Sequence, residues 1–217
     1  MALIDAGGTV LSRGEDDKST HHIYTTNFGV PESHEAELYQ HFADRDGIRD
    51  HAEHAEQQSR MIDHFKSVPG KMSDEKYFRS LTNSLIEDTE LLEGAEAFIE
   101  ELEERGYNTV ILSSAPAAAN IYPAKRLGAD QVYSWKTFEF DEEGNFQEIS
   151  VNEEATEGKH EVVEALQGKN VLVAHFGNGL NDREALEKAD ISAMRTGTQD
   201  PSSFYGEALE EVENYGY

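Results

Sequence analysis

A carboxylate follows directly after the first apolar run of the chain. The run Ala2-Leu3-Ile4 is followed by the string Asp5-Ala6-Gly7-Gly8-Thr9. This order predicts a buried strand that ends in a tight turn, which the glycines permit. A carboxylate held there can attack phosphorus as a nucleophile, while backbone N–H groups and a metal ion offset the phosphate charge. Asp5 is therefore a candidate nucleophile, and an ordinary turn aspartate is the alternative.

Hydroxyl and ammonium groups at two further positions suit a bound phosphate. Ser113 and Ser114 follow the apolar run 109–112, so a hydroxyl there can donate to a phosphate oxygen. Lys159 lies in the predicted first turn of a helix, with Thr156 as the N-cap. A cation at that end of a helix is disfavoured by about 0.3–1 kcal/mol at an exposed site, whereas a phosphate and two carboxylates would stabilise it. Lys159 is thus either a site residue or a solvated surface lysine.

The string Gly177-Asn178-Gly179-Leu180-Asn181-Asp182 is the most specific one in the chain. It lies between the apolar run 171–174 and the helical stretch 183–189. Amide and carboxylate oxygens are ligands that suit Mg²⁺, and the N-terminus of the helix favours a phosphate. The string predicts a site for both, with simple helix capping as the alternative.

Strands and helices must alternate to bring these strings together. Five short apolar runs predict strands, at 2–4, 109–112, 131–133, 171–174 and 191–194. Between them, apolar residues recur at helical spacing from Leu91 through Ala95 and Phe98 to Leu102, and Gly106 supplies a stop. Such alternation predicts an α/β fold with a Rossmann-like parallel sheet, whose ligands lie at the carboxyl ends of the strands.

Two segments interrupt this alternation. Residues 15–90 carry helical patterns without convincing strands, so we expect an inserted helical cap. The catalytic core then comprises residues 1–14 and 91–217. Within the core, alternating phenylalanines and the turn string Glu143-Gly144-Asn145 predict a small hairpin insertion at about 131–150.

In this order the motifs resemble those of the haloacid dehalogenase superfamily of hydrolases, with the phosphoserine-phosphatase-like branch the nearest likeness. Asp5 and Thr9 match the ends of its D-x-D-x-T motif, and Asn181 and Asp182 match the end of its G-D-G-x-N-D motif. The likeness covers about residues 1–12 and 90–197.

The resemblance implies roles for particular residues. The catalytic residues would be Asp5 as nucleophile, Ser113 as phosphate ligand and Lys159 as the lysine that steadies the nucleophile. The residues implied to bind substrate are Gly8, Thr9, Ser113, Ser114 and Asn181. The groups implied to bind Mg²⁺ are Asp5, the Gly7 carbonyl, Asn178 and Asp182.

Two positions depart from the family pattern. Gly7 stands where the phosphatases have a general acid, and loss of such an acid typically costs about 10²–10⁴ in rate. Asn178 stands where they have a metal-binding aspartate, so weaker metal binding is expected. A replacement acid could come from His175, His21 or His22, each of which has a surface or packing role as the alternative.

The leading interpretation is a Mg²⁺-dependent hydrolase of a small phosphorylated metabolite, acting through an aspartyl-phosphate at Asp5. One alternative is a catalytically impaired phosphate-binding or regulatory protein. Another is cleavage of a carbon–halogen bond, which needs no metal, or of a carbon–phosphorus bond, which would need a cap lysine such as Lys66, Lys71 or Lys76 as a Schiff base.

Composition limits the partners. The formal net charge is −26, with 44 acidic against 18 basic residues, which argues against nucleic-acid binding. The acidic residues are spread along the chain, a composition that resembles halophilic proteins. The sequence has no cysteine and no long apolar run, so we expect a cytoplasmic protein with no membrane partner. The substrate and the oligomeric state stay open.

Overall fold

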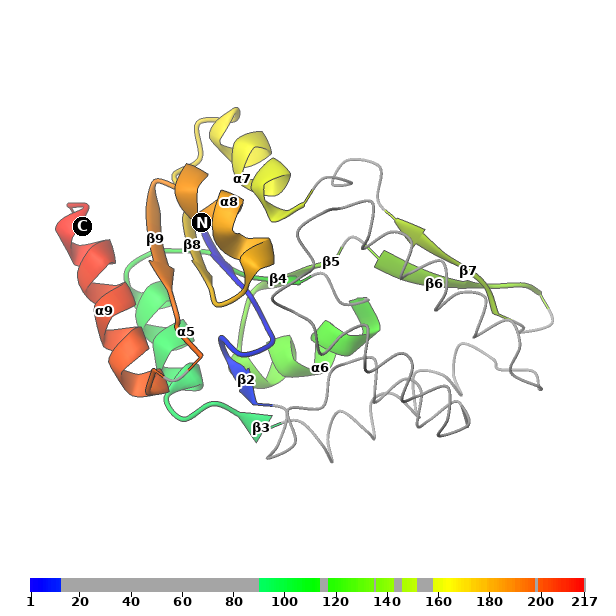
Figure 1. The fold of residues 1–217 in the computed structure, drawn as a ribbon, viewed down its shortest axis with the longest axis horizontal. Coiled ribbons are helices and arrows are strands. Elements are labelled where there is room, and N and C mark those ends of the chain that lie inside the picture. Colours follow the sequence, from blue (N-terminus) through cyan, green and yellow to red (C-terminus); the bar gives the residue numbers. More distant parts are fainter. Residues whose placement is uncertain are drawn as a thin grey trace.

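The core is a five-stranded parallel sheet. The computed structural model describes residues 1–12, 90–113, 117–134, 136–142, 146–151, 158–197 and 199–216. The strand order is β5–β4–β1–β8–β9 (Figure 1), and every neighbouring pair is parallel. The strands are β1 (Ala2–Ile4), β4 (Thr109–Ser113), β5 (Gln131–Ser134), β8 (Ala174–Gly177) and β9 (Ile191–Met194). The predicted Rossmann-like α/β core is confirmed.

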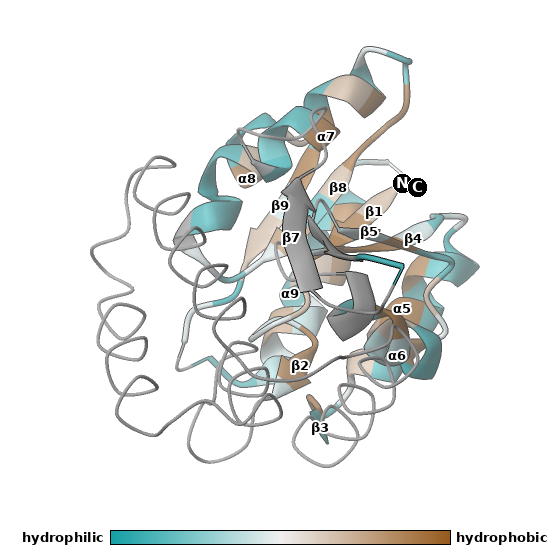
Figure 2. Cartoon of the chain, turned by 90° about the vertical axis from the view of Figure 1, so that its right-hand side faces the viewer, coloured by the Kyte–Doolittle hydropathy of each residue, from teal (hydrophilic) through white to brown (hydrophobic). Residues whose placement is uncertain are grey.

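Helices cover both faces of this sheet. One face packs against α5 (Ala95–Glu104), α6 (Ala117–Leu127) and α9 (Pro201–Asn214), and the other packs against α7 (Lys159–Gln167) and α8 (Arg183–Lys188). Successive strand residues point to opposite faces, so Ile4 joins the first core cluster and Leu3 joins the second. Figure 2 shows apolar colour along the central strands and polar colour on the outer turns of α8.

The helix predicted from Leu91 is shorter than its apolar pattern. Ala95, Phe98 and Leu102 are buried on α5, and Gly106 ends the helix with a φ of 83°. Leu91 lies instead in β3 (Glu90–Leu91), which pairs antiparallel with β2 (Leu11–Ser12). This pair joins the two chain segments on either side of residues 13–89. All of the cap predicted at 15–90 except Glu90 lies outside the described residues.

The strand predicted at 171–174 was placed three residues too early, because β8 runs from Ala174 to Gly177. Its neighbour β1 begins at Ala2, which pairs with Ala174, so earlier residues have no ladder partner on that side. The apolar residues before β8 bond elsewhere. Leu172 accepts from the N-terminal ammonium, and the Val173 N–H donates to the Asp190 carboxylate.

A second antiparallel pair consists of β6 (Lys136–Phe140) and β7 (Phe146–Val151). Both strands lie in the segment for which a hairpin insertion was predicted, although residues 131–134 belong to β5 of the main sheet. The expected turn at 143–145 lies outside the described residues. Within the described part of the chain, the helices are too short or too polar to cross a bilayer.

An aromatic cluster joins α5, α9 and β8. The Phe98 ring stacks on Tyr205 at a centroid distance of 4.7 Å and meets Phe176 edge-on at 5.3 Å. We expect Phe98→Ala to lower the free energy of unfolding by about 3–5 kcal/mol, because it leaves a cavity. Denaturant titration in molar KCl checks this. A loss of about 0.5 kcal/mol, as expected for exposed Ile121→Ala, would contradict the assignment.

Candidate active site

The loop after β1 folds back on itself and presents Asp5 at the carboxyl edge of the sheet. The Asp5 N–H donates to the Phe176 carbonyl of β8, at 2.8 Å. The N–H groups of Val10 and Leu11 both return to the Ala6 carbonyl, at 3.1 and 3.0 Å. Gly8 has a φ of 80°, a conformation that side chains other than glycine rarely adopt. The predicted glycine turn therefore holds the carboxylate in a fixed place.

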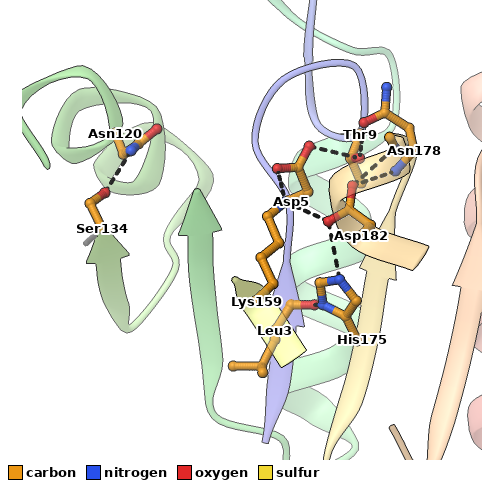
Figure 3. A network of polar contacts seen from close by, with 10 residues as sticks. Leu3, Asp5, Thr9, Asn120, Ser134, Lys159, His175, Asn178 and Asp182 are labelled. Carbon is orange, nitrogen blue, oxygen red and sulfur yellow. Dashed lines mark hydrogen bonds and ion pairs between the residues drawn. The ribbon is translucent and has the colours of Figure 1, made fainter. Parts of the chain in front are cut away.

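Lys159 lies between two carboxylates (Figure 3). Its Nζ donates to Asp5 Oδ1 and to Asp182 Oδ1. The lysine is 1% exposed and is the first residue of α7, directly after the N-cap position at Gly158. The expected N-cap, Thr156, lies outside the described residues. The two anions offset the unfavourable position of a cation at a helix N-terminus. The alternative of a solvated surface lysine is therefore wrong.

The ion pair between Lys159 and Asp182 keeps both side chains charged at neutral pH. Burial by itself lowers the pKa of Lys159, but attraction by Asp5 and Asp182 outweighs burial and raises it above the ordinary value. Burial likewise raises the pKa of Asp182, yet Lys159 and His175 together hold it far below its usual range. Asp182 is thus a carboxylate that only accepts hydrogen bonds.

All four acceptor positions of the Asp182 carboxylate are in use. Oδ1 accepts from Lys159 and faces His175 Nε2 at 3.2 Å, while Oδ2 accepts from the N–H groups of Asn178 and Gly179, at 3.2 and 2.9 Å. Gly177 permits this approach, because a Cβ there would collide with the Asp182 side chain. These contacts make Asp182 the second carboxylate partner of Lys159, and its expected role as a metal ligand stays a prediction.

Asn178 reaches from the turn after β8 to the loop after β1. The terminal side-chain atom that faces the loop lies 2.8 Å from the Gly7 carbonyl oxygen and 3.1 Å from Asp5 Oδ2. The same atom lies 3.2 Å from Thr9 Oγ1. If it is the amide nitrogen, it donates to these oxygens. If it is the amide oxygen, it accepts from the Thr9 hydroxyl and lies beside two further acceptors, the Gly7 carbonyl and Asp5 Oδ2.

Three such oxygens fit a magnesium ion. Neighbouring ligands of octahedral Mg²⁺, at 2.0–2.1 Å from the metal, lie about 3 Å apart. The separations of the Asn178 atom from Gly7 O and Asp5 Oδ2 match this spacing. In the described part of the chain, no group of three or more His, Cys, Asp or Glu side chains is placed to hold a metal. A cation here would therefore depend on a carbonyl and an amide oxygen besides Asp5.

Two residues that hold the loop after β1 had no sequence signal. Arg195, directly after β9, donates from Nη1 to the Gly8 carbonyl and from Nη2 to Gln199 O at 2.9 Å. The Tyr205 hydroxyl of α9 donates to the Thr9 carbonyl at 2.8 Å, and burial raises the pKa of this phenol. Both residues lie more than 180 positions from the loop, so only the folded chain brings them there.

The other predicted residues lie at varying distances from this centre. Ser113 is buried at the end of β4. Ile4 of β1 pairs with Ile111 of β4, so Ser113 lies two residues beyond this pair, at the edge of the sheet where the loop after β1 begins. Asn181 is exposed, with its side-chain oxygen close over Gly179. His175 is buried with both ring nitrogens facing oxygens, so neither is exposed to act as the replacement acid. Other predicted residues lie outside the described part: Ser114, His21, His22, Lys66, Lys71 and Lys76.

The fold and these side chains define a doubly wound α/β protein with a carboxylate at the switch point of a parallel sheet. The family model of haloacid dehalogenase-like hydrolases matches residues 2–190, and the chain belongs to this family. No curated protein sequence matches the chain significantly.

Several solved structures share the fold. A phospho-aspartyl intermediate analogue of phosphoserine phosphatase is 17% identical, with a TM-score of 0.64 over 99% of this chain and 97% of that one. A phosphoserine phosphohydrolase-like protein from Francisella tularensis is 14% identical, with a TM-score of 0.66 over 100% and 99%. A cytosolic 5′-nucleotidase IIIB bound to cytidine is 13% identical, with a TM-score of 0.57 over 98% and 87%.

Gly8 provides a test of the contact between Asn178 and the loop. Gly8 and Gly106 have nearly the same positive φ, but a Cβ on Gly8 would collide with Asn178, whereas a Cβ on Gly106 would meet open space. We expect Gly106→Ala to cost about 1–2 kcal/mol of unfolding free energy from backbone strain. Gly8→Ala should cost about 1–3 kcal/mol more, from overpacking. Equal losses in denaturant titrations would contradict the close contact.

Proposed function

We propose that this hydrolase acts on a small phosphorylated metabolite, depends on Mg²⁺ and forms an aspartyl-phosphate at Asp5. The observation that carries the proposal is the ion-paired Asp5 carboxylate, held at the carboxyl edge of the sheet by Lys159. The likeness to phosphoserine phosphatases supports a phosphate monoester as the substrate class.

Each residue of the site has a distinct task in this proposal. Asp5 attacks phosphorus, the bond to the leaving group breaks, and the phosphoryl group is carried on the carboxylate. Lys159 fixes the orientation of Asp5 and offsets the charge that builds up when a carboxylate and a phosphate meet. Asp182 keeps Lys159 in place. Ser113 and the N–H groups of the loop that ends at Thr9 bind the phosphate oxygens.

Asp5, the Gly7 carbonyl and the Asn178 amide would hold the magnesium ion. When bound, the ion supplies positive charge that offsets the charge of the phosphate. Only one of these three groups is an anion, so we expect a weaker metal site than one with several carboxylates.

The missing side chain at position 7 determines which substrates react well. Gly7 cannot protonate a leaving group, and an alkoxide leaves poorly without a proton. We therefore expect a strong preference for substrates whose leaving group is already a weak base, such as a phenolate.

Hydrolysis of an activated aryl phosphate in molar KCl tests the proposal. We expect turnover that requires added Mg²⁺ and that Asp5→Asn abolishes, because an amide is not a nucleophile. Asp130→Asn is the matched control, since Asp130 accepts from Thr109 N at the opposite end of β4. Turnover by Asp5→Asn near the level of the unchanged protein would remove Asp5 from the mechanism.

Asn178→Asp tests the metal site directly. An added anion beside Asp5 Oδ2 and Gly7 O should tighten Mg²⁺ binding, measured by isothermal titration calorimetry. Asn108→Asp adds the same charge at an exposed position before β4 and should leave the affinity unchanged. Equal Mg²⁺ affinities for both variants would show that position 178 is not a ligand.

The other orientation of the Asn178 amide favours a second candidate, metal-independent cleavage of a carbon–halogen bond. With its nitrogen towards the loop, the amide donates to Gly7 O and Asp5 Oδ2 and so orders the carboxylate without a cation. Attack of Asp5 on carbon would then need neither metal nor leaving-group proton. Halide release from a short 2-haloacid in the presence of a chelator supports this candidate, and its absence rejects it.

A further inference from the structure

His175 is a buried polar residue that the proposed reaction does not use. It is fully buried on β8 and pairs in register with Leu3 of β1. Its Nδ1 lies 3.1 Å from the Leu3 carbonyl oxygen, and its Nε2 lies 3.2 Å from Asp182 Oδ1. The ring therefore links the centre of the sheet to the carboxylate that holds Lys159 (Figure 3).

The contact with Asp182 requires a donor on the ring. Asp182 is ionised and only accepts hydrogen bonds, so His175 Nε2 is the donor to Asp182 Oδ1. Four buried or nearly buried side chains then form one connected network, in which Lys159 joins Asp5 to Asp182 and His175 contacts Asp182.

The network explains why Lys159 stays shared between two carboxylates. Without His175, Lys159 would be the only side-chain donor to Asp182 Oδ1, and that oxygen would draw the ammonium away from Asp5. The hydrogen bond from His175 takes up part of the charge on Oδ1. It also fixes the orientation of Asp182, whose Oδ2 is held by two backbone N–H groups.

We propose that His175 is a positioning residue that acts through Asp182 to keep the Lys159 ammonium on Asp5. The proposal deepens the proposed function and rests on it only for the statement that Asp5 reacts. A purely structural role is the competing explanation, in which the ring serves to join β8 to β1 through Leu3.

Two conservative variants separate these explanations. His175→Gln places an amide nitrogen where Nε2 was and retains the bond to Asp182. His175→Asn places one where Nδ1 was and retains only the bond to Leu3. With an aryl phosphate, we expect His175→Asn to lower kcat about 10- to 100-fold with KM unchanged, as for other residues that orient a catalytic group.

His175→Gln should recover most of that loss. A purely structural role predicts the reverse order, or equal losses in both variants, and either result would overturn the proposal.

A readout independent of turnover is the ¹⁵N NMR signal of the Lys159 ammonium, assigned by its disappearance in Lys159→Met. We expect this signal to be retained in His175→Gln and shifted or lost through solvent exchange in folded His175→Asn. An unchanged signal in His175→Asn would overturn the positioning role. If the unchanged protein hydrolyses no aryl phosphate, the proposed function fails while this measurement still decides the role of His175.

Discussion

The rest of the site depends on one buried ammonium group held between two carboxylates. A lysine with no exposed side chain is costly unless anions compensate its charge, and removal of one partner of a buried pair is strongly destabilising. Asp5 comes from the end of β1, Lys159 from the start of α7 and Asp182 from the turn before α8. Parallel strands bring these three elements to one edge of the sheet, so the charge pairing and the strand order support each other.

Close backbone packing sustains this charge pairing. Gly177 lets the Asp182 side chain lie against β8, and Gly8 lets Asn178 approach the loop after β1. Arg195 and Tyr205 then hold the same loop from the C-terminal part of the chain. Gly8 and Gly177 are thus explained by close contacts with the polar side chains of Asn178 and Asp182.

Much of this arrangement could be predicted from the sequence, because strands buried on both faces appear as apolar runs and end at polar or glycine-rich strings. The parallel direction of the strands follows from their alternation with helices. The unfavourable place of Lys159 at a helix start left carboxylate partners as one of two explanations. The start of β8 could not be predicted, since it depends on where β1 begins. The positions of Arg195 and Tyr205, and the partners of His175, are set by tertiary packing between distant segments, for which a local pattern carries no signal.

In the proposed reaction, Asp5 is the nucleophile that receives the phosphoryl group. The most direct measurement is to quench the enzyme in acid during turnover of an aryl phosphate, reduce the acyl phosphate with borohydride and sequence the peptides by mass spectrometry. The account predicts homoserine at position 5, formed only with substrate. Turnover with aspartate intact at position 5, or with the modification at another residue, would contradict it.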